Sequence, residues 1–173
     1  MTSTPETEDT RLLGTLRPLD DRVGAVRMED LYDTDADDLW SALTEPERLA
    51  RWMGEVQGDL TLGGRIEARF TSSWTGPGRI DVCDAPRRLQ VTLEPGSEDE
   101  TVVEAILTPE GTRTRLVIEE RGLPIGVLPA HGAGWQAHVE DLAAHLAGRE
   151  ARDWKTRWTA LIPAYRTLAG AWV

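Results

Sequence analysis

The three histidines of the chain, His131, His138 and His145, are spaced seven residues apart. On a helix this spacing puts them on one stripe, with neighbours about 10.5 Å apart along the axis. A single metal ion cannot bridge that distance, because imidazole nitrogens bind zinc at about 2.1 Å. We therefore expect no metal site. His138 flanks an apolar stripe, so it is either a core histidine or a residue that contacts a ligand.

An acidic run at residues 29–38 begins like a calcium-binding EF-hand loop, with Asp33, Asp35 and Asp37 at alternate positions. The rest of the motif fails. Asp38 stands where the loop needs glycine, and Thr44 stands where it needs a bidentate glutamate. Acidic residues also favour the first turn of a helix, because they complement its dipole. We interpret the run as a helix N-terminus.

Residues 132–137 match the pattern GxGxxA and are expected to open a helix. A dinucleotide site also needs a strand before this motif, a second strand after the helix and an acidic residue about 20 positions on. Pro129 lies just before the motif and no strand-like run follows the helix. We expect the glycines to permit a tight turn or a close approach of the helix to the sheet, and we expect no cofactor.

The remaining reactive side chains do not form a catalytic pattern. Cys83 is the single cysteine, so it cannot form an intramolecular disulfide. No helix start or cationic cluster lies near it to activate the thiol, and we expect a buried, small hydrophobic side chain. The sequence nominates neither a nucleophile with its base nor a spaced pair of carboxylates. We predict no catalytic residue, although folds with large cavities can catalyse reactions with scattered polar groups.

The first elements that would position these residues are a hairpin and two short helices. Segments 12–17 and 23–31 flank a turn rich in proline and aspartate, which predicts a β-hairpin, or at least a first strand at 22–32. A helix is then expected with Thr34 as its N-cap, followed by a second helix that starts at Thr44.

From about residue 55 to 122 the pattern is typical of strands. Ile66, Ala68 and Phe70 alternate with charged residues. Turn residues recur at intervals of about ten, and the stretch TGPG at 75–78 is expected to be one of these turns. The pattern predicts an antiparallel meander.

The longest helix is predicted after the strands and ends near Gly148, a plausible C′ residue. Its apolar stripe consists of Trp135, Val139, Leu142 and Leu146. Residues 150–173 predict a further amphipathic helix, interrupted or kinked at Pro163.

Length and charge limit the classes of function. The chain has 173 residues, which suits one domain. Its 30 acidic against 19 basic residues give a net charge of −11, which disfavours nucleic acids and anionic membrane surfaces as partners. We expect residues 1–10 to be a disordered tail without features of a secretory signal. No apolar run is long enough to span a membrane. We therefore expect a cytoplasmic protein.

Several motifs, in their order and spacing, resemble the branch of the START/Bet v 1-like (SRPBCC) superfamily named after the activator of Hsp90 ATPase homologue (AHSA1-like). The resemblance covers roughly residues 22–149. It rests on Leu39-Trp40, LTEPERLARWM at 43–53, Gly63-Gly64, Gly78, the segments 85–89 and 111–116, and Gly134-Trp135.

The resemblance implies an α+β helix-grip (START/Bet v 1-like) fold. A curved antiparallel sheet would wrap around a long C-terminal helix, with two short helices after the first strand. Between sheet and helix this superfamily has an apolar cavity that holds lipids, sterols, polyketides or other hydrophobic molecules. Trp40 is expected to fill the core, and the expected ligand-binding residues are Trp52, Met53, Phe70, Trp74, Trp135, His138 and Leu142.

We thus expect a helix-grip domain at residues 11–149 and a helical extension at 150–173, which covers the cavity mouth or forms a homodimer contact. The leading hypothesis is an intracellular protein that binds a small hydrophobic or aromatic molecule without chemistry of its own. One alternative is an enzyme similar to polyketide cyclases or aromatases, with His138 as a proton shuttle. Another is a stress-related protein-interaction module. Activation of Hsp90 is not expected, because the co-chaperone also uses a separate N-terminal domain.

Overall fold

The computed structural model describes residues 11–170, so the tail predicted at 1–10 lies outside the described residues. The strands are β1 (Gly14–Pro18), β2 (Val23–Tyr32), β3 (Gly54–Gly58), β4 (Arg65–Phe70), β5 (Thr75–Asp84), β6 (Arg88–Leu93), β7 (Thr101–Glu110) and β8 (Arg113–Pro124). The helices are α1 (Ala36–Thr44), α2 (Pro46–Leu49), the 3-10 helix η1 (Ile125–Val127), α3 (Leu128–Leu146) and α4 (Trp154–Ala169).

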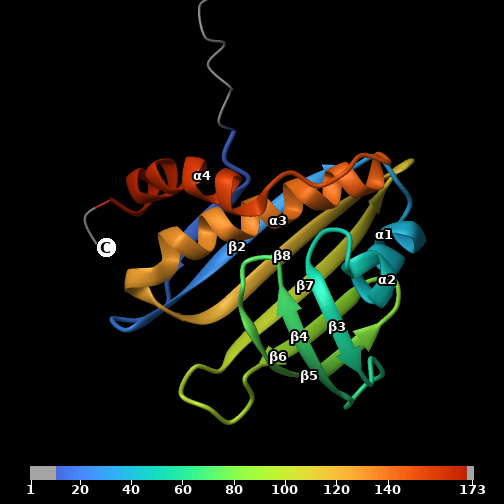
Figure 1. Cartoon of the computed structure of the whole chain (residues 1–173), viewed down its shortest axis with the longest axis horizontal. Coiled ribbons are helices and arrows are strands. Elements are labelled where there is room, and N and C mark those ends of the chain that lie inside the picture. Colours follow the sequence, from blue (N-terminus) through green and yellow to red (C-terminus); the bar gives the residue numbers. More distant parts are fainter. Residues whose placement is uncertain (1–10, 171–173) are drawn as a thin grey trace, which may run out of the picture.

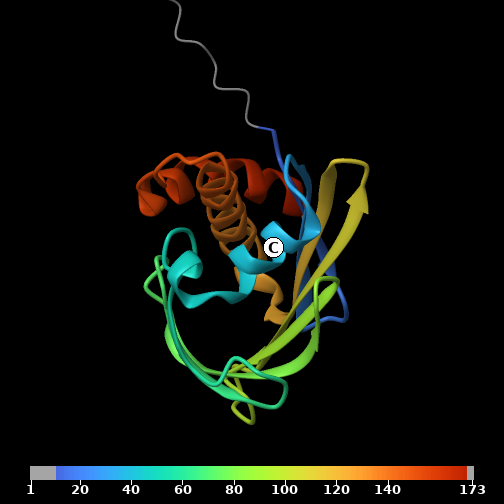
Figure 2. The ribbon, with the colours of Figure 1, turned by 90° about the vertical axis from the view of Figure 1, so that its right-hand side faces the viewer.

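The strands form one antiparallel sheet in the order β1-β2-β8-β7-β6-β5-β4-β3. The sheet curves around α3 (Figure 2), α1 and α2 lie at one end, and α4 packs on α3 (Figure 1). The core fills the space between the concave face of the sheet and α3. The predicted α+β helix-grip fold is confirmed. The predicted hairpin is β1–β2, so the two short helices follow the second strand rather than the first.

Two predictions about β5 are wrong. Residues 75–78 form the start of the strand, because the chain reverses earlier, where Ser73 adopts a φ of 75°. Pro77 lacks only an amide hydrogen, and its carbonyl accepts a hydrogen bond of 2.9 Å from the Glu94 N–H. Cys83 is exposed rather than buried. It lies one residue from the end of β5, where the strand runs out beyond the core.

The predicted helix caps are also wrong. Asp35, not Thr34, caps α1, and its side chain accepts a hydrogen bond of 2.8 Å from the Asp38 N–H. The Thr34 hydroxyl donates to the Asp38 carboxylate instead. Thr44 belongs to α1, and its hydroxyl donates to the Trp40 carbonyl. The acidic run is nevertheless a helix N-terminus, and residues 11–170 contain no cluster of potential metal ligands.

Helix α3 begins at Leu128, four residues before the GxGxxA motif that was expected to open it. Gly132 lies against both the sheet and α4: a Cβ atom there would lie 2.6 Å from Cδ1 of Tyr165 and 3.0 Å from Cδ2 of Leu16. A Cβ at Gly134 would lie 3.2 Å from the ring of Trp154. The expected close approach of α3 to the sheet is therefore present, and α4 also approaches α3 closely at these glycines.

Helix α4 continues through Pro163, so the helix is not interrupted there; of the two predicted effects of this proline, the kink stays a prediction. Gly148 follows the end of α3 with a φ of 72°, as expected for a C′ glycine. Trp40 was expected to fill the core; it is half-buried and packs against the edge of the core instead. Among the described residues, no helix combines the length and the apolar character that crossing a membrane requires.

We expect Gly132→Ala to lower the free energy of unfolding by about 1–3 kcal/mol, because the added methyl group overlaps the Tyr165 ring. Helix propensity alone predicts the opposite sign, since alanine favours a helix over glycine by about 1 kcal/mol. The matched control is Gly126→Ala, where no atom lies within 4 Å of the new Cβ. Urea unfolding of the two variants measures both effects. Equal stabilities would contradict the close packing of α3 and α4.

Candidate functional site

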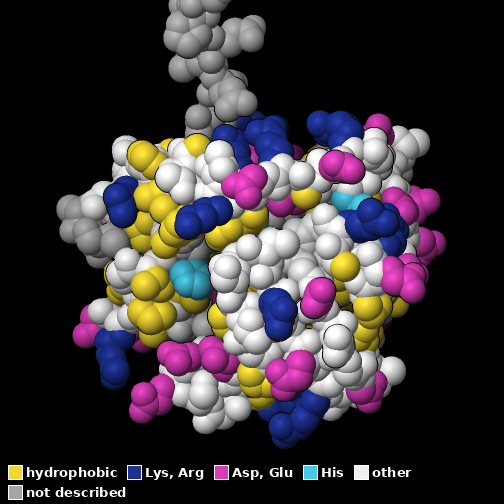
Figure 3. Space-filling view, in the orientation of Figure 1, with side chains coloured by type: hydrophobic (Ala, Val, Ile, Leu, Met, Phe, Trp, Pro, Cys, Tyr) yellow, Lys and Arg dark blue, Asp and Glu magenta, His cyan; other side chains and the backbone are white. Residues whose placement is uncertain are grey.

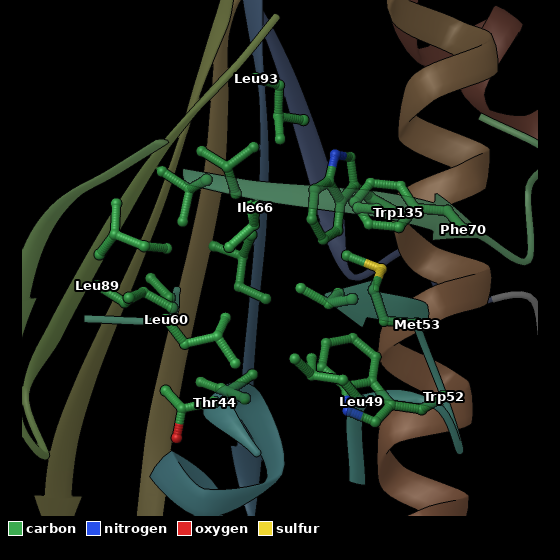
Figure 4. Close-up of a pocket in the computed structure, with 18 residues that line it drawn as sticks. Thr44, Leu49, Trp52, Met53, Leu60, Ile66, Phe70, Leu89, Leu93 and Trp135 are labelled. Atoms are coloured by element: carbon green, nitrogen blue, oxygen red, sulfur yellow. The ribbon is translucent and has the colours of Figure 1, made fainter. Parts of the chain in front are cut away.

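A cavity lies between the concave face of the sheet and α3. Figure 4 shows Leu93, Phe70 and Trp135 toward one end, and Thr44 and Trp52 toward the end formed by α1 and α2. We call it the inner cavity. Its lining residues are Leu43, Thr44, Leu49, Trp52, Met53, Val56, Leu60, Ile66, Ala68, Phe70, Ile80, Leu89, Val91, Leu93, Val103, Ala105, Ile118 and Trp135.

The lining of the inner cavity consists mainly of apolar side chains, and its few polar atoms already form hydrogen bonds within the protein. The Thr44 hydroxyl donates to the Trp40 carbonyl at 2.8 Å. The indole N–H of Trp52 donates to the Ala42 carbonyl at 2.9 Å. The indole N–H of Trp135 donates to Oε2 of Glu120 at 2.7 Å. A molecule in the cavity therefore gains mainly from removal of apolar surface from water.

The size of the inner cavity suits a small ligand. The volume open to the centres of water molecules is about 110 Å³. A sphere of that volume, enlarged by the ~1.4 Å radius of water, encloses roughly 350 Å³. Sites for small molecules occupy about 300–1,000 Å³, so the cavity lies at the lower end of that range. It has room for a compact ring system.

A second hollow, the outer groove, adjoins the inner cavity; the volume open to the centres of water molecules is about 770 Å³ there, against about 110 Å³ in the inner cavity. Four residues line both spaces: Met53, Phe70, Leu93 and Trp135. The other residues that line the groove are Arg22, Val23, Ser72, Ser73, Trp74, Glu94, Glu98, Asp99, Thr101, Glu120, Gly122, Leu123, Pro124, Val127, Ala130, His131, Gly134, His138, Trp154 and Trp158. Because the two spaces share a wall at the end away from α1 and α2, the groove is the natural approach to the cavity.

Aromatic rings contact one another along this shared wall. Phe70 and Trp74 have their ring centroids 4.8 Å apart. The His138 ring lies 6.0 Å from Trp135 and 5.3 Å from Trp154. Trp154 in turn stacks on Trp158 at 5.6 Å, with 13° between the ring planes. Trp154 and Trp158 thus bring α4 into the wall of the outer groove, and Trp154 contacts the same histidine as Trp135 of α3.

His138 is buried within this aromatic wall. Desolvation lowers the pKa of its imidazole to about 4, partly opposed by a backbone hydrogen bond to Trp52. Its Nδ1 lies 3.5 Å from the Thr71 hydroxyl. The ring is therefore neutral at pH 7. A base with so low a pKa is poorly matched to proton transfer near neutral pH, which weakens the predicted role of His138 as a proton shuttle.

The neutral state of His138 makes stability depend on pH. An unfolded histidine binds a proton below about pH 6.5, whereas the folded ring resists protonation down to about pH 4. The contribution of His138 to stability is therefore complete above pH 6.5. As the pH falls from 6.5 to 4, this contribution to the free energy of unfolding decreases by about 3 kcal/mol.

Between pH 6.5 and 4 we expect the free energy of unfolding of the wild-type protein to fall by about 3 kcal/mol more than that of His138→Gln, because glutamine does not titrate. Asp141 contributes in the opposite direction, because burial raises the pKa of its carboxyl to about 6 and its protonation favours the folded state. This contribution cancels in the comparison. Chemical unfolding at pH 8, 6 and 4 measures the difference between the two proteins. A difference that does not change with pH would show that His138 is not held neutral by burial.

Glu120 is the residue of this site that the sequence analysis missed. It is 6% exposed, lines the outer groove, and accepts hydrogen bonds from Thr101 at 2.8 Å and Trp135 at 2.7 Å. Nδ1 of His131 lies 3.9 Å from its Oε2. A signal was present in β8, where Leu116, Ile118 and Glu120 share the inward-facing parity of one strand. A carboxylate at an inward position marks a polar point in an apolar interior.

The structure brings most of the predicted ligand-binding residues together. Trp52 lines the inner cavity, Trp74 and His138 line the outer groove, and Met53, Phe70 and Trp135 line both. Leu142 is fully buried in the core and lines neither space. Whether these side chains contact a ligand stays a prediction.

Comparison with protein-family models matches residues 33–147 to the family described as "Activator of Hsp90 ATPase homolog 1-like protein". The match spans more than half of the chain. A search of the curated proteins found no matching relative.

Solved structures share the fold over most of the chain. CalU16 from Micromonospora echinospora is 25% identical with a TM-score of 0.75, and the match covers 91% of this chain and 98% of that one. DynU16, a protein of the dynemicin biosynthetic locus, is 27% identical with a TM-score of 0.67; the match covers 78% of this chain and 51% of that one. The protein encoded by gene BPP1335 from Bordetella parapertussis is 22% identical with a TM-score of 0.69, and the match covers 96% of this chain and 94% of that one. At this identity the likeness shows the fold alone.

Proposed function

The chain belongs to the Activator of Hsp90 ATPase homolog 1-like family, and we propose that it binds a small hydrophobic or aromatic molecule in the inner cavity. The observation that carries this proposal is an apolar cavity whose polar atoms already have protein partners. Such a lining selects for apolar surface on the ligand. The outer groove would admit the ligand past the aromatic side chains of the shared wall.

The comparisons favour a ligand from small-molecule biosynthesis. DynU16 belongs to the dynemicin biosynthetic locus, and this chain is 27% identical to it over the matched region. We therefore propose an apolar product or intermediate of such a pathway as the class of ligand. The protein would sequester or carry this molecule, because an apolar cavity favours burial of apolar surface and shields the molecule from water.

Tryptophan fluorescence tests the proposal, since Trp52 and Trp135 line the cavity. The probe is N-phenyl-1-naphthylamine, a neutral apolar dye, titrated into the wild-type chain with compounds of one, two and three fused rings as competitors. We expect saturable energy transfer from tryptophan to the dye, and competition that depends on ring number. Binding that fails to saturate, or a thermal midpoint unchanged by every compound, would contradict the proposal.

A second function, acid–base chemistry on the bound molecule, is favoured by the pair formed by Glu120 and His131. The imidazole Nδ1 lies 3.9 Å from the carboxylate, and both side chains line the outer groove. This pair could move a proton on a polyketide-like substrate, as the cyclase or aromatase alternative requires. Conversion of a reactive polyketide thioester, followed by mass spectrometry, is the test. Equal product yields with wild-type protein and His131→Ala would reject this role.

A further inference from the structure

Glu120 is an ionisable side chain in an apolar setting. It lies in β8 at 6% exposure, and its partners across the sheet are Val26 on β2 and Val103 on β7. Val103 lines the inner cavity, and Glu120 itself lines the outer groove. The carboxylate therefore stands where the cavity and the groove meet.

The hydrogen bonds of Glu120 leave part of its acceptor capacity unused. Thr101 donates to Oε1 and Trp135 donates to Oε2, and both donors are neutral. A carboxylate has about four acceptor positions. Within residues 11–170 no arginine or lysine forms a salt bridge with it; His131, which is half-exposed, approaches to 3.9 Å. Buried carboxylates are usually paired with a cation, because isolated burial of a charge is costly.

The rim of the outer groove has the same sign of charge as Glu120. Glu94, Glu98 and Asp99 lie on its β6–β7 side, and Arg22 is its one arginine among the described residues. Acidic side chains gather in this region below a patch of hydrophobic ones (Figure 3). A groove with mostly acidic charges and apolar walls attracts cations. The faces of its tryptophan rings add to that attraction.

We propose that the ligand carries a protonated amine on an apolar body, with the body in the inner cavity and the ammonium group in the outer groove against the Glu120 carboxylate. The inference rests on the proposed function, because it assigns the polar end of the same ligand. The ammonium group supplies the cationic partner that the carboxylate lacks. It also uses acceptor positions that Thr101 and Trp135 leave open.

Two compounds of matched shape test this proposal: 2-(naphthalen-2-yl)ethylamine and 2-(naphthalen-2-yl)ethanol. We expect the wild-type chain at pH 7 to bind the amine at least about 10-fold more tightly, as charge-assisted hydrogen bonds require. Glu120→Gln keeps the size of the side chain and removes its charge. This variant should bind the two compounds equally, because its affinity for the amine falls while its affinity for the alcohol stays the same. Glu67→Gln removes a charge from an exposed position on β4 and should keep the preference.

Calorimetry measures the six affinities, those of the wild-type chain, Glu120→Gln and Glu67→Gln for each of the two compounds, and it distinguishes the possible failures. Equal affinity of the wild-type chain for both compounds overturns the inference and leaves the proposed function standing. Failure of both compounds to bind overturns both. If Glu120→Gln bound both compounds more weakly by the same factor, the inference would also be overturned, because Glu120 would then only position Trp135. Should that variant not fold, nuclear magnetic resonance of the wild-type chain replaces it: the amine should shift the side-chain carboxylate carbon of Glu120 more than the alcohol does, and equal shifts overturn the inference.

Discussion

Replacement of Ala105 by phenylalanine is expected to abolish binding of aromatic compounds while the protein stays folded. Ala105 lies on β7 between Leu89 and Ile118, and all three residues line the inner cavity. The added phenyl ring would occupy the space that the ligand needs. Its burial contributes about 2 kcal/mol, which offsets an overpacking cost of about 1–3 kcal/mol, so the net change in stability is small.

The matched control for this variant is Ala160→Phe, at an exposed position of α4 that lines neither space. It makes the same chemical change and should bind the dye like the wild-type chain. Dissociation constants and urea unfolding curves of the three proteins give the answer. If folded Ala105→Phe protein bound the dye with unchanged affinity, the ligand would lie outside the inner cavity.

The largest loss of stability is expected from Tyr165→Ala, which should lower the free energy of unfolding by about 3–5 kcal/mol. Tyr165 is fully buried, and its ring packs on Gly132 of α3. Its hydroxyl donates to Oε1 of Gln136 at 2.6 Å and accepts from the Gly14 N–H at 3.1 Å. One side chain thus connects α4 to α3 and to β1.

Two further variants separate the contributions of Tyr165. Tyr165→Phe keeps the ring and leaves the Gly14 N–H unpaired, which should cost about 1–3 kcal/mol. Arg166→Ala, at the exposed next position of α4, should change stability by less than about 0.5 kcal/mol. Urea unfolding ranks the three proteins. A cost below about 1 kcal/mol for Tyr165→Ala would mean that α4 does not stabilise the domain.

The fold was largely predictable because strand alternation and motif order are properties of the sequence. Ile66 and Ala68 do face the core, as their spacing predicts. Local turn and cap preferences were less reliable. The glycines and proline of 75–78 favour a turn, yet pairing with β4 draws them into a strand. Asp35 and Thr34 are both good caps, and sequence alone did not distinguish them.

The site was only partly predictable, because α3 is covered on several sides. Thirteen of its residues are buried, so an apolar stripe does not reveal which of them face the cavity and which face other elements. Trp135 lines the cavity, whereas Leu142 packs in the core although both belong to the predicted stripe. The contact of Trp154 with His138 depends on the packing of α4 against α3, which no local pattern encodes.

The six isoleucines allow the most direct test of a ligand between sheet and helix. Ile66, Ile80 and Ile118 line the inner cavity, and the other three, Ile106, Ile125 and Ile162, line neither space. Nuclear Overhauser effects between the bound naphthyl compound and isoleucine δ1-methyl groups can be measured on selectively labelled protein. We expect contacts to the first three methyl groups and none to the others. Contacts confined to Ile106, Ile125 or Ile162 would contradict binding in the cavity.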